Sequence, residues 1–192
     1  MLSPSDSIAL TEALKPTPGF VFDAAVGTSF TLDLETLLTA PIAFALFDTT
    51  GEGDEGSDGA EPIGLLEAIR RYANRITVFC QAGQVAIPKQ HRLLYAWLEE
   101  AVYATNAPRR GHLFHPKLWL ARYSSPTGDA AVLRVLCATR NVTFDSSWDT
   151  VLKLETDPYV PGKIGTENTR LSTSFDPLAV LQPARLSRDG RR

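Results

Sequence analysis

The sequence predicts an α/β fold: a three-layer sandwich in which a mixed β-sheet is flanked by helices. In the first half, short apolar runs of strand length alternate with segments of helical periodicity, and a strand–turn–strand pattern follows in the second half. A chain of 192 residues is long enough for one domain with a substantial core. We therefore expect a single lobe at 20–156, after a lead-in at 1–19 and before a tail or linker at 157–192.

The composition is that of a globular protein, with 44% hydrophobic and 21% charged residues. No apolar run approaches the roughly 18 residues of a membrane span, and the first residues lack the basic start and apolar core of a signal peptide. We expect a cytoplasmic protein without a membrane partner. Cys80 and Cys137 both lie in apolar, strand-like runs, which predicts buried free thiols.

The first half of the predicted lobe contains two strands and one helix. Phe20–Val26 is predicted as the first strand, Leu32–Ala40 as a short helix, and Pro41–Phe47 as a buried second strand. Asp48–Glu61 is acidic and Gly-rich without apolar anchors, so we expect a mobile loop. Its carboxylates do not have the spacing of an EF-hand calcium loop.

The middle of the chain continues the alternation of helix and strand. Pro62–Ala73 has a helical apolar face with proline in its first turn, and Ile76–Cys80 is a central strand. Gln81–Ile87 is predicted as a loop, and Pro88–Thr105 as the longest helix. The aromatic residues of this helix are expected in the core: Tyr95, Trp97 and Tyr103.

A hairpin with polar residues at its open end follows. Its predicted strands, 113–123 and 130–140, flank a turn rich in Ser, Pro and Gly. Folding about Thr127 places His115 opposite Thr139, with Cβ atoms about 5 Å apart, and side chains two residues apart share a face. We expect one cluster at this end, made by His115, Lys117, Thr139 and Asn141. An imidazole, a cation and an amide donor together suit a phosphoryl group.

These residues also resemble a known signature. His115-Pro116-Lys117, then Thr139-Arg140-Asn141, then the polar segment with Ser146, Ser147 and Asp149 are similar to the His-x-Lys and Ser/Thr-x-Asn motifs of the phospholipase D superfamily. The apolar frame is most similar to the tyrosyl-DNA phosphodiesterase and prokaryotic nuclease branches. Two features depart from the family pattern: Arg122 stands where its fullest form has Asp, and the motif occurs once, whereas the family's active site needs two.

The resemblance implies a phosphodiesterase that needs no metal or other cofactor. It implies that His115 is the nucleophile or the acid and that Lys117 and Asn141 clamp the phosphate. Thr139 and Ser147 would be polar supports, and Asp149 would orient an imidazole. The second motif would come from a homodimer mate, another subunit or a C-terminal half. Such lobes are typical of nucleases, DNA being favoured over RNA as the substrate, and in prokaryotes they often belong to antiviral defence.

The charge distribution agrees with a nucleic-acid substrate. Residues 1–85 carry twelve acidic and four basic residues, whereas 86–141 carry eight basic and three acidic ones, within a net charge of −3. A phosphodiester substrate requires such a positive region around the site. The candidates for nucleic-acid contact are Arg109, Arg110, Arg122 and Arg140.

Three alternatives remain open. A catalytically inactive lobe could serve as a nucleic-acid or protein-binding platform, as Arg122 and the single motif suggest. A lipid phosphodiesterase should carry an amphipathic membrane-facing segment, which the sequence lacks. A metal site made by His112, His115 and Cys137 has weak spacing, and Lys117 would repel a cation.

Overall fold

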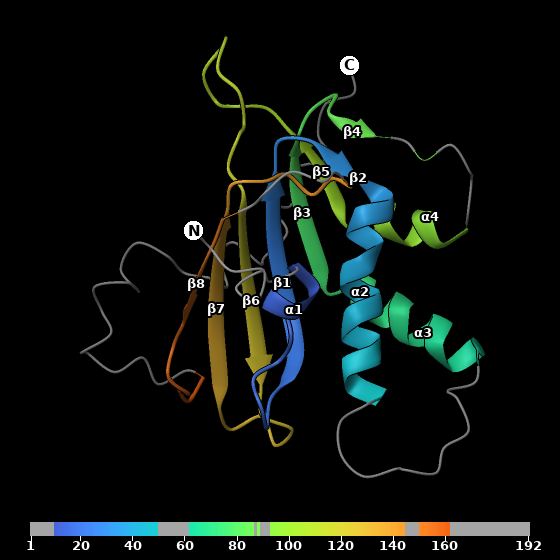
Figure 1. Ribbon diagram of the computed structural model, residues 1–192, viewed down its shortest axis with the longest axis vertical. Coiled ribbons are helices and arrows are strands. Elements are labelled where there is room, and N and C mark those ends of the chain that lie inside the picture. Colours follow the sequence, from blue (N-terminus) through green and yellow to red (C-terminus); the bar gives the residue numbers. More distant parts are fainter. Residues whose placement is uncertain (1–9, 50–61, 87, 89–92, 145–149, 162–192) are drawn as a thin grey trace, which may run out of the picture.

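The computed structural model shows a mixed six-stranded sheet, a small two-stranded sheet and flanking helices (Figure 1). It describes residues 10–49, 62–86, 88, 93–144 and 150–161. The predicted fold class, a three-layer α/β sandwich with a mixed sheet, is confirmed. Within these ranges, none of the helices combines the length and the apolar character needed to cross a membrane.

Twelve elements are seen in the described ranges. The helices are α1 (Leu10–Ala13), α2 (Leu34–Thr49), α3 (Pro62–Ala73) and α4 (Leu93–Glu99). The strands of the large sheet are β1 (Val21–Ser29), β3 (Ile76–Gln81), β5 (Val102–Thr105), β6 (Leu118–Ser124), β7 (Ala131–Ala138) and β8 (Val151–Glu155). The small sheet pairs β2 (Leu32–Asp33) with β4 (Val85–Ala86).

The strand order of the large sheet is β5-β3-β1-β6-β7-β8. Strands β1, β3 and β5 are parallel, while β6 runs antiparallel to β1, and β7 antiparallel to β6. The carboxyl ends of β1, β3, β5 and β7 therefore meet the amino end of β6 at one edge of the sheet. We call this the carboxyl edge; its strand ends are Ser29, Gln81, Thr105, Ala138 and Leu118.

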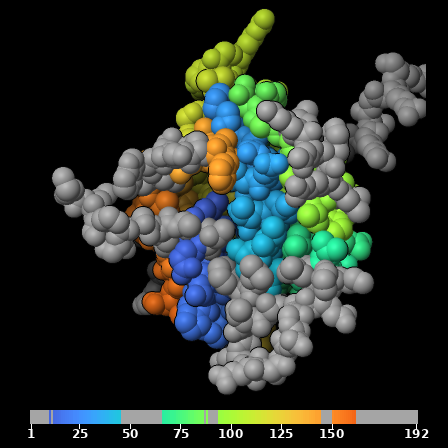
Figure 2. Space-filling view, turned by 45° about the vertical axis from the view of Figure 1, so that its right-hand side comes forward, coloured from blue at the N-terminus to red at the C-terminus, as the bar shows by residue number. Residues whose placement is uncertain are grey.

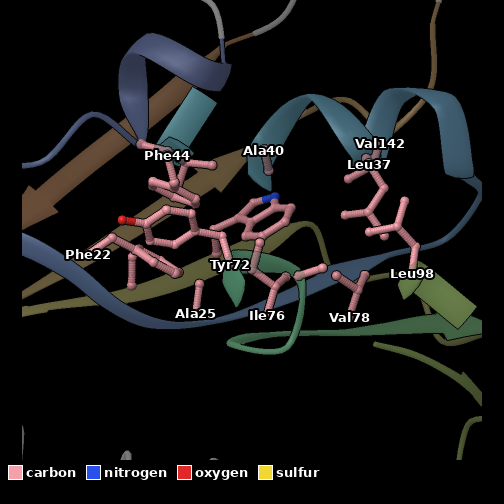
Figure 3. Close-up of a cluster of buried hydrophobic side chains, with 14 of the residues drawn as sticks. Phe22, Ala25, Leu37, Ala40, Phe44, Tyr72, Ile76, Val78, Leu98 and Val142 are labelled. Atoms are coloured by element: carbon pink, nitrogen blue, oxygen red, sulfur yellow. The ribbon is translucent and has the colours of Figure 1, made fainter. Parts of the chain in front are cut away.

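The core lies between the large sheet and its helices. Side chains of α2, α3 and α4 meet those of β1 and β3 in one apolar cluster, which Figure 3 shows. Phe22 of β1 stacks on Phe44 of α2, with ring centroids 3.8 Å apart, and meets Tyr72 of α3 edge-on at 5.8 Å. Burial of these large aromatic rings fixes α2 across the sheet, with its first turn near the carboxyl edge.

The predicted second strand at Pro41–Phe47 is wrong, because these residues continue helix α2. Pro41 lies inside the helix and is fully buried. Helix α2 packs against α1, α3 and α4. A helix surrounded by other elements is apolar on every side, so its sequence lacks helical periodicity and cannot be told from a buried strand.

The predicted long helix at Pro88–Thr105 is also wrong in its last part. Helix α4 ends at Glu99, and Val102–Thr105 forms strand β5, which pairs with β3. Its pairing partner lies 24 residues earlier in the register, Val78 opposite Val102, so the local pattern could not reveal it. Tyr95 is buried as predicted, whereas Tyr103 on β5 is exposed.

Strands β6 and β7 form the predicted hairpin, with a register one residue from the predicted one. Leu118 pairs with Cys137 and Ser124 with Ala131, so the twofold point lies between Thr127 and Gly128. Gly128, with a φ of 74°, takes the left-handed turn position, and the Asp129 carboxylate accepts hydrogen bonds from Ser125 and Thr127. These bonds lower the pKa of the Asp129 carboxyl.

Part of the predicted lead-in is firmly held. Ala13 and Leu14 are fully buried, and the Tyr123 hydroxyl donates a 2.7 Å hydrogen bond to the Leu14 carbonyl. Asp48 and Thr49, predicted as the start of the mobile loop, belong to α2, and Tyr159 of the predicted tail pairs with Ala131 of β7. The rest of the lead-in (1–9), of the loop (50–61) and of the tail (162–192) lies outside the described residues.

One face of strands β6, β7 and β8 is apolar and exposed. Cross-strand pairs align Leu118 with Cys137 and Leu152, and the next row aligns Val135 with Leu154. Cys137 is therefore exposed and not buried as predicted, because strand alternation turns it away from the helices. Cys80 of β3 is buried as predicted.

Candidate functional site

His115 and Lys117 lie together at the carboxyl edge. The Lys117 ammonium is 2.9 Å from Nδ1 and 3.3 Å from Nε2 of the His115 imidazole, so it can donate to a ring nitrogen that carries a lone pair. The His115 ring also packs against Phe30, with centroids 4.8 Å apart and planes tilted by 43°. His115 is exposed and Lys117 half-buried, which leaves the imidazole open to solvent.

The end of β1 fixes the segment that carries these two residues. The Leu118 amide donates to the Thr28 hydroxyl at 2.9 Å, and this hydroxyl is 3.3 Å from the Leu118 carbonyl, to which it donates. On the other side, the Ala138 amide donates to the Lys117 carbonyl at 2.9 Å. The backbone at Lys117 and Leu118 is thus held between β1 and β7.

Asn141 reaches the same edge from the end of β7. Its Oδ1 accepts a 3.2 Å hydrogen bond from the Phe30 amide, which leaves Nδ2 as the donating end of the side chain. The next residue is fixed as well: the Val142 amide donates to Ser29 Oγ at 3.0 Å, and the Val142 carbonyl accepts from the Asp33 amide at 2.8 Å. Phe30 therefore contacts His115 with its ring and Asn141 with its backbone.

Gln81 supports the site from β3. It is 9% exposed, and its Oε1 accepts a 2.7 Å hydrogen bond from the amide of Phe114, the residue before His115. Its Nε2 donates to Asn106 Oδ1 at 3.2 Å. These bonds hold both ends of the β5–β6 loop, residues 106–117, against the sheet.

Four further residues at the ends of β1 and β3 build this site and were not predicted as site residues: Thr28, Ser29, Phe30 and Gln81. The signal was present, since all four follow a predicted strand within four residues. In open α/β sheets, ligands bind outside the carboxyl ends of the strands.

Of the predicted site residues, the structure brings His115 and Lys117 into contact, and Phe30 links them to Asn141. Thr139 has another partner: its hydroxyl accepts a 3.0 Å hydrogen bond from the Thr150 amide at the start of β8. Ala138 lies beside Lys117, and the one-residue shift in register moves Thr139 out of the predicted position opposite His115. Ser147 and Asp149 lie outside the described residues.

The four predicted arginines do not form one group. Arg109 and Arg110 are exposed on the β5–β6 loop, and Arg140 stands beside Asn141 and donates to the Thr143 carbonyl at 3.3 Å. Arg122 lies five residues along β6 from Lys117, roughly 17 Å away at strand rise, and its Nε donates to Asp23 at 2.5 Å. Arg122 therefore does not belong to the carboxyl-edge site.

The thiol of Cys80 lies buried near the site. Burial raises the pKa of the Cys80 thiol, and this thiol donates to the Phe30 carbonyl at 3.3 Å. Throughout the described ranges, no three His, Cys, Asp or Glu side chains are grouped so that they could hold a metal ion.

Comparisons of this chain with protein-family models, with curated proteins and with solved structures found no match.

Proposed function

We propose that this chain is a phosphodiesterase lobe that cleaves nucleic acid through a phosphohistidine intermediate. The observation that carries the proposal is the contact of the His115 imidazole with the Lys117 ammonium at 2.9 Å, at an exposed edge that Asn141 also reaches. The likeness to the phospholipase D signature gives these three residues their proposed roles.

The chemistry proceeds in two displacements. A His115 ring nitrogen attacks phosphorus, and the P–O bond to the leaving strand breaks as that oxygen takes a proton. Water then attacks phosphorus, gives its proton to the group that protonated the leaving oxygen, and breaks the P–N bond, which restores both groups. Splitting one difficult displacement in two lowers each barrier. The Lys117 ammonium and the Asn141 amide hold the non-bridging oxygens, whose charge rises in each transition state.

The Lys117 ammonium lies against the imidazole that has to attack. An arriving phosphate offers this ammonium a negatively charged acceptor in place of the ring nitrogen. Transfer of the ammonium to a phosphate oxygen would free the ring lone pair for attack. Substrate binding would then activate the nucleophile without a separate base.

The proposal requires a second imidazole to protonate the leaving oxygen. The sequence has three histidines. His112 lies only three residues before His115 in the same loop, which is too close to face it across a phosphate. A second copy related by twofold symmetry would supply the partner imidazole, and twofold dimers are the commonest homo-oligomers.

The decisive experiment is cleavage of labelled single- and double-stranded DNA in EDTA, with the molar mass measured by light scattering in the same buffer. We expect cleavage by a dimer and its loss in His115→Ala. His112→Ala is the matched control, because this neighbouring histidine is exposed and should be dispensable. Equal loss in both variants, or cleavage that survives in His115→Ala, would contradict the proposed nucleophile.

A binding platform without catalysis is the second candidate. It is favoured by Arg122, which occupies the position of the Asp in the fullest family motif. The Arg122 side chain is paired with Asp23. In this case, wild type and His115→Ala should bind DNA with the same salt-dependent affinity, and neither should cleave it.

A further inference from the structure

Two exposed apolar side chains flank the candidate site. Phe144 is 90% exposed and Leu113 is 64% exposed, the two highest values among the large apolar side chains that the structure describes. Leu113 lies two residues before His115, and Phe144 lies three residues after Asn141. Single exposed apolar residues are common on protein surfaces, but here the two most exposed ones belong to the two loops that carry the site residues.

The backbone beside each of these side chains is anchored. Leu113 precedes Phe114, whose amide is bound by Gln81. On the other loop, Val142 is bonded to Ser29 and Asp33, and the Arg140 guanidinium donates to the Thr143 carbonyl at 3.3 Å. Phe144 therefore projects into solvent, and the residue before it, Thr143, is held by a hydrogen bond.

The distance from Phe144 to the proposed phosphate clamp is limited by the chain. Three residues span at most about 10 Å between Cα atoms, so Phe144 lies within this distance of Asn141. Figure 2 shows the loop after β7, in orange, at the surface beside the end of β1, with the β5–β6 loop projecting above it. A nucleotide whose phosphate lies at His115 has its own or a neighbouring base within reach of this ring.

We propose that the carboxyl edge takes single-stranded nucleic acid, with an unpaired base stacked on Phe144 while the adjoining phosphate lies at His115 and Lys117. The inference rests on the proposed function and specifies its substrate class. An aromatic ring that presents its face to solvent is a stacking platform for any base. Within a duplex, both faces of each base are covered by neighbouring pairs, so the platform selects unpaired nucleotides.

The charges around the two side chains fit this ligand. Arg109 and Arg110 are exposed on the same loop as Leu113, where they can follow a phosphate backbone. The apolar groups are two side chains on different loops. An interfacial membrane anchor instead presents one broad apolar face. The apolar face of this chain lies on β6, β7 and β8, and Phe144 and Leu113 stand apart from it on loops. Their separation favours a nucleic-acid strand over a lipid surface.

The test measures binding in the His115→Ala background, in EDTA, by fluorescence anisotropy. The probes are a labelled single-stranded oligothymidylate and an oligonucleotide of equal length whose residues are abasic. Phe144→Ala should weaken oligothymidylate binding roughly five- to a hundredfold, the usual effect of one base–aromatic stack, and leave abasic binding unchanged. Phe144→Trp should retain affinity. Leu154→Ala is the matched control, since this exposed leucine lies on β8.

Equal losses on both probes, no loss on either, or no binding to any oligonucleotide would overturn the inference. Phosphatidylglycerol vesicles provide the competing arm: sedimentation with vesicles that disappears in Phe144→Ala, with oligonucleotide binding intact, would assign the ring to a membrane. The outcome is separate from that of the cleavage assay. If binding depends on the bases but wild type does not cleave, the nuclease proposal is contradicted and base stacking on Phe144 is supported. If wild type cleaves and Phe144→Ala changes neither cleavage nor binding, the nuclease proposal is supported and base stacking is contradicted.

Discussion

The sheet contains two groups of cationic and polar side chains, and their surroundings differ sharply. Within the sheet, the guanidinium of Arg134 on β7 is fully buried and donates to the carbonyls of Ala13 and Lys15, to Tyr123 and Thr17, and to the Glu155 carboxylate. At the carboxyl edge, the cation of Lys117 contacts an exposed imidazole. The first group is saturated with protein partners, whereas the second can still accept a ligand.

The protonation equilibria of the buried group reflect its structural role. Burial raises the pKa of Tyr123 to about 12, against the opposing effect of the nearby Arg134 charge. Burial alone would raise the pKa of Glu155, but the hydrogen bonds from Arg134 and Thr17, together with the charge of Arg134, hold it below its ordinary value. The buried cation therefore stabilises the fold, whereas the half-buried Lys117 ammonium, which contacts an exposed imidazole, can still be reached by a ligand.

The largest expected effect comes from breaking the buried group. Arg134→Met removes the donor that Arg134 supplies to the carbonyls of Ala13 and Lys15, to Tyr123 and to Glu155. We therefore expect a loss of about 3–5 kcal/mol in the free energy of unfolding. Arg122→Met is the control, because its ion pair with Asp23 is partly exposed and should contribute about 1 kcal/mol or less. Urea unfolding measures both. Equal losses would remove the distinction between buried and exposed cations.

Gln81→Leu sharpens the comparison at the carboxyl edge. It removes the acceptor of the Phe114 amide, and a buried donor left without a partner costs about 1–3 kcal/mol. We expect faster hydrogen exchange at the Phe114 amide and weaker oligonucleotide cleavage, with exchange in the middle of β3 unchanged. Gln84→Leu is the matched control, because Gln84 is exposed. Slow exchange at Phe114 in the Gln81 variant would show that another contact positions this loop.

Acid should reduce the contribution of the Glu155–Arg134 pair to the free energy of unfolding. Because the folded-state pKa of Glu155 is lowered, its contribution is complete above the ordinary glutamate pKa of about 4.3 and is lost as pH falls through the lower folded value. The difference in unfolding free energy between wild type and Glu155→Gln should therefore be constant near neutral pH and shrink below about pH 4. A constant difference into strong acid would assign the contribution to packing.

The smallest expected effect is that of the proposed site residue on stability. Lys117→Ala should change the unfolding free energy by no more than about 0.5 kcal/mol, as at other sites without buried polar contacts. Cleavage should nevertheless fall by about a hundredfold or more, since this ammonium is proposed to stabilise transition-state charge. Thermal unfolding and kcat measured on the same sample separate the two. A large loss of stability would show that the contact with His115 serves the fold.

The elements that the sequence predicted well are those whose pattern is local. Helix α3 has the predicted bounds, β3 lies within one residue of its prediction, and the β6–β7 hairpin has its turn chemistry in the sequence. The second half of helix α2 and strand β5 were missed because tertiary surroundings, not local periodicity, decide their conformation. His115 and Lys117 meet because they are two residues apart at the end of the β5–β6 loop, which the sequence predicted as part of a strand. Their positions after predicted strands mark Phe30 and Gln81 as candidates, but their contacts with Asn141 and Phe114 depend on which strands become neighbours.

The sheet topology also sets an order of events during folding. Hairpin β6–β7 can close as soon as its residues are available, in microseconds. Its neighbour β1 pairs with β6 across about a hundred positions of the sequence, as in the pair Val21 and Ser124. Contacts of such high sequence separation form slowly. During synthesis, β1 is made long before β6, so one side of this central strand stays unpaired until β6 is available. The hydrogen bond between Phe30 and Asn141 can form only after β1 and β6 have paired. The proposed active site is therefore assembled late, when the sheet is complete.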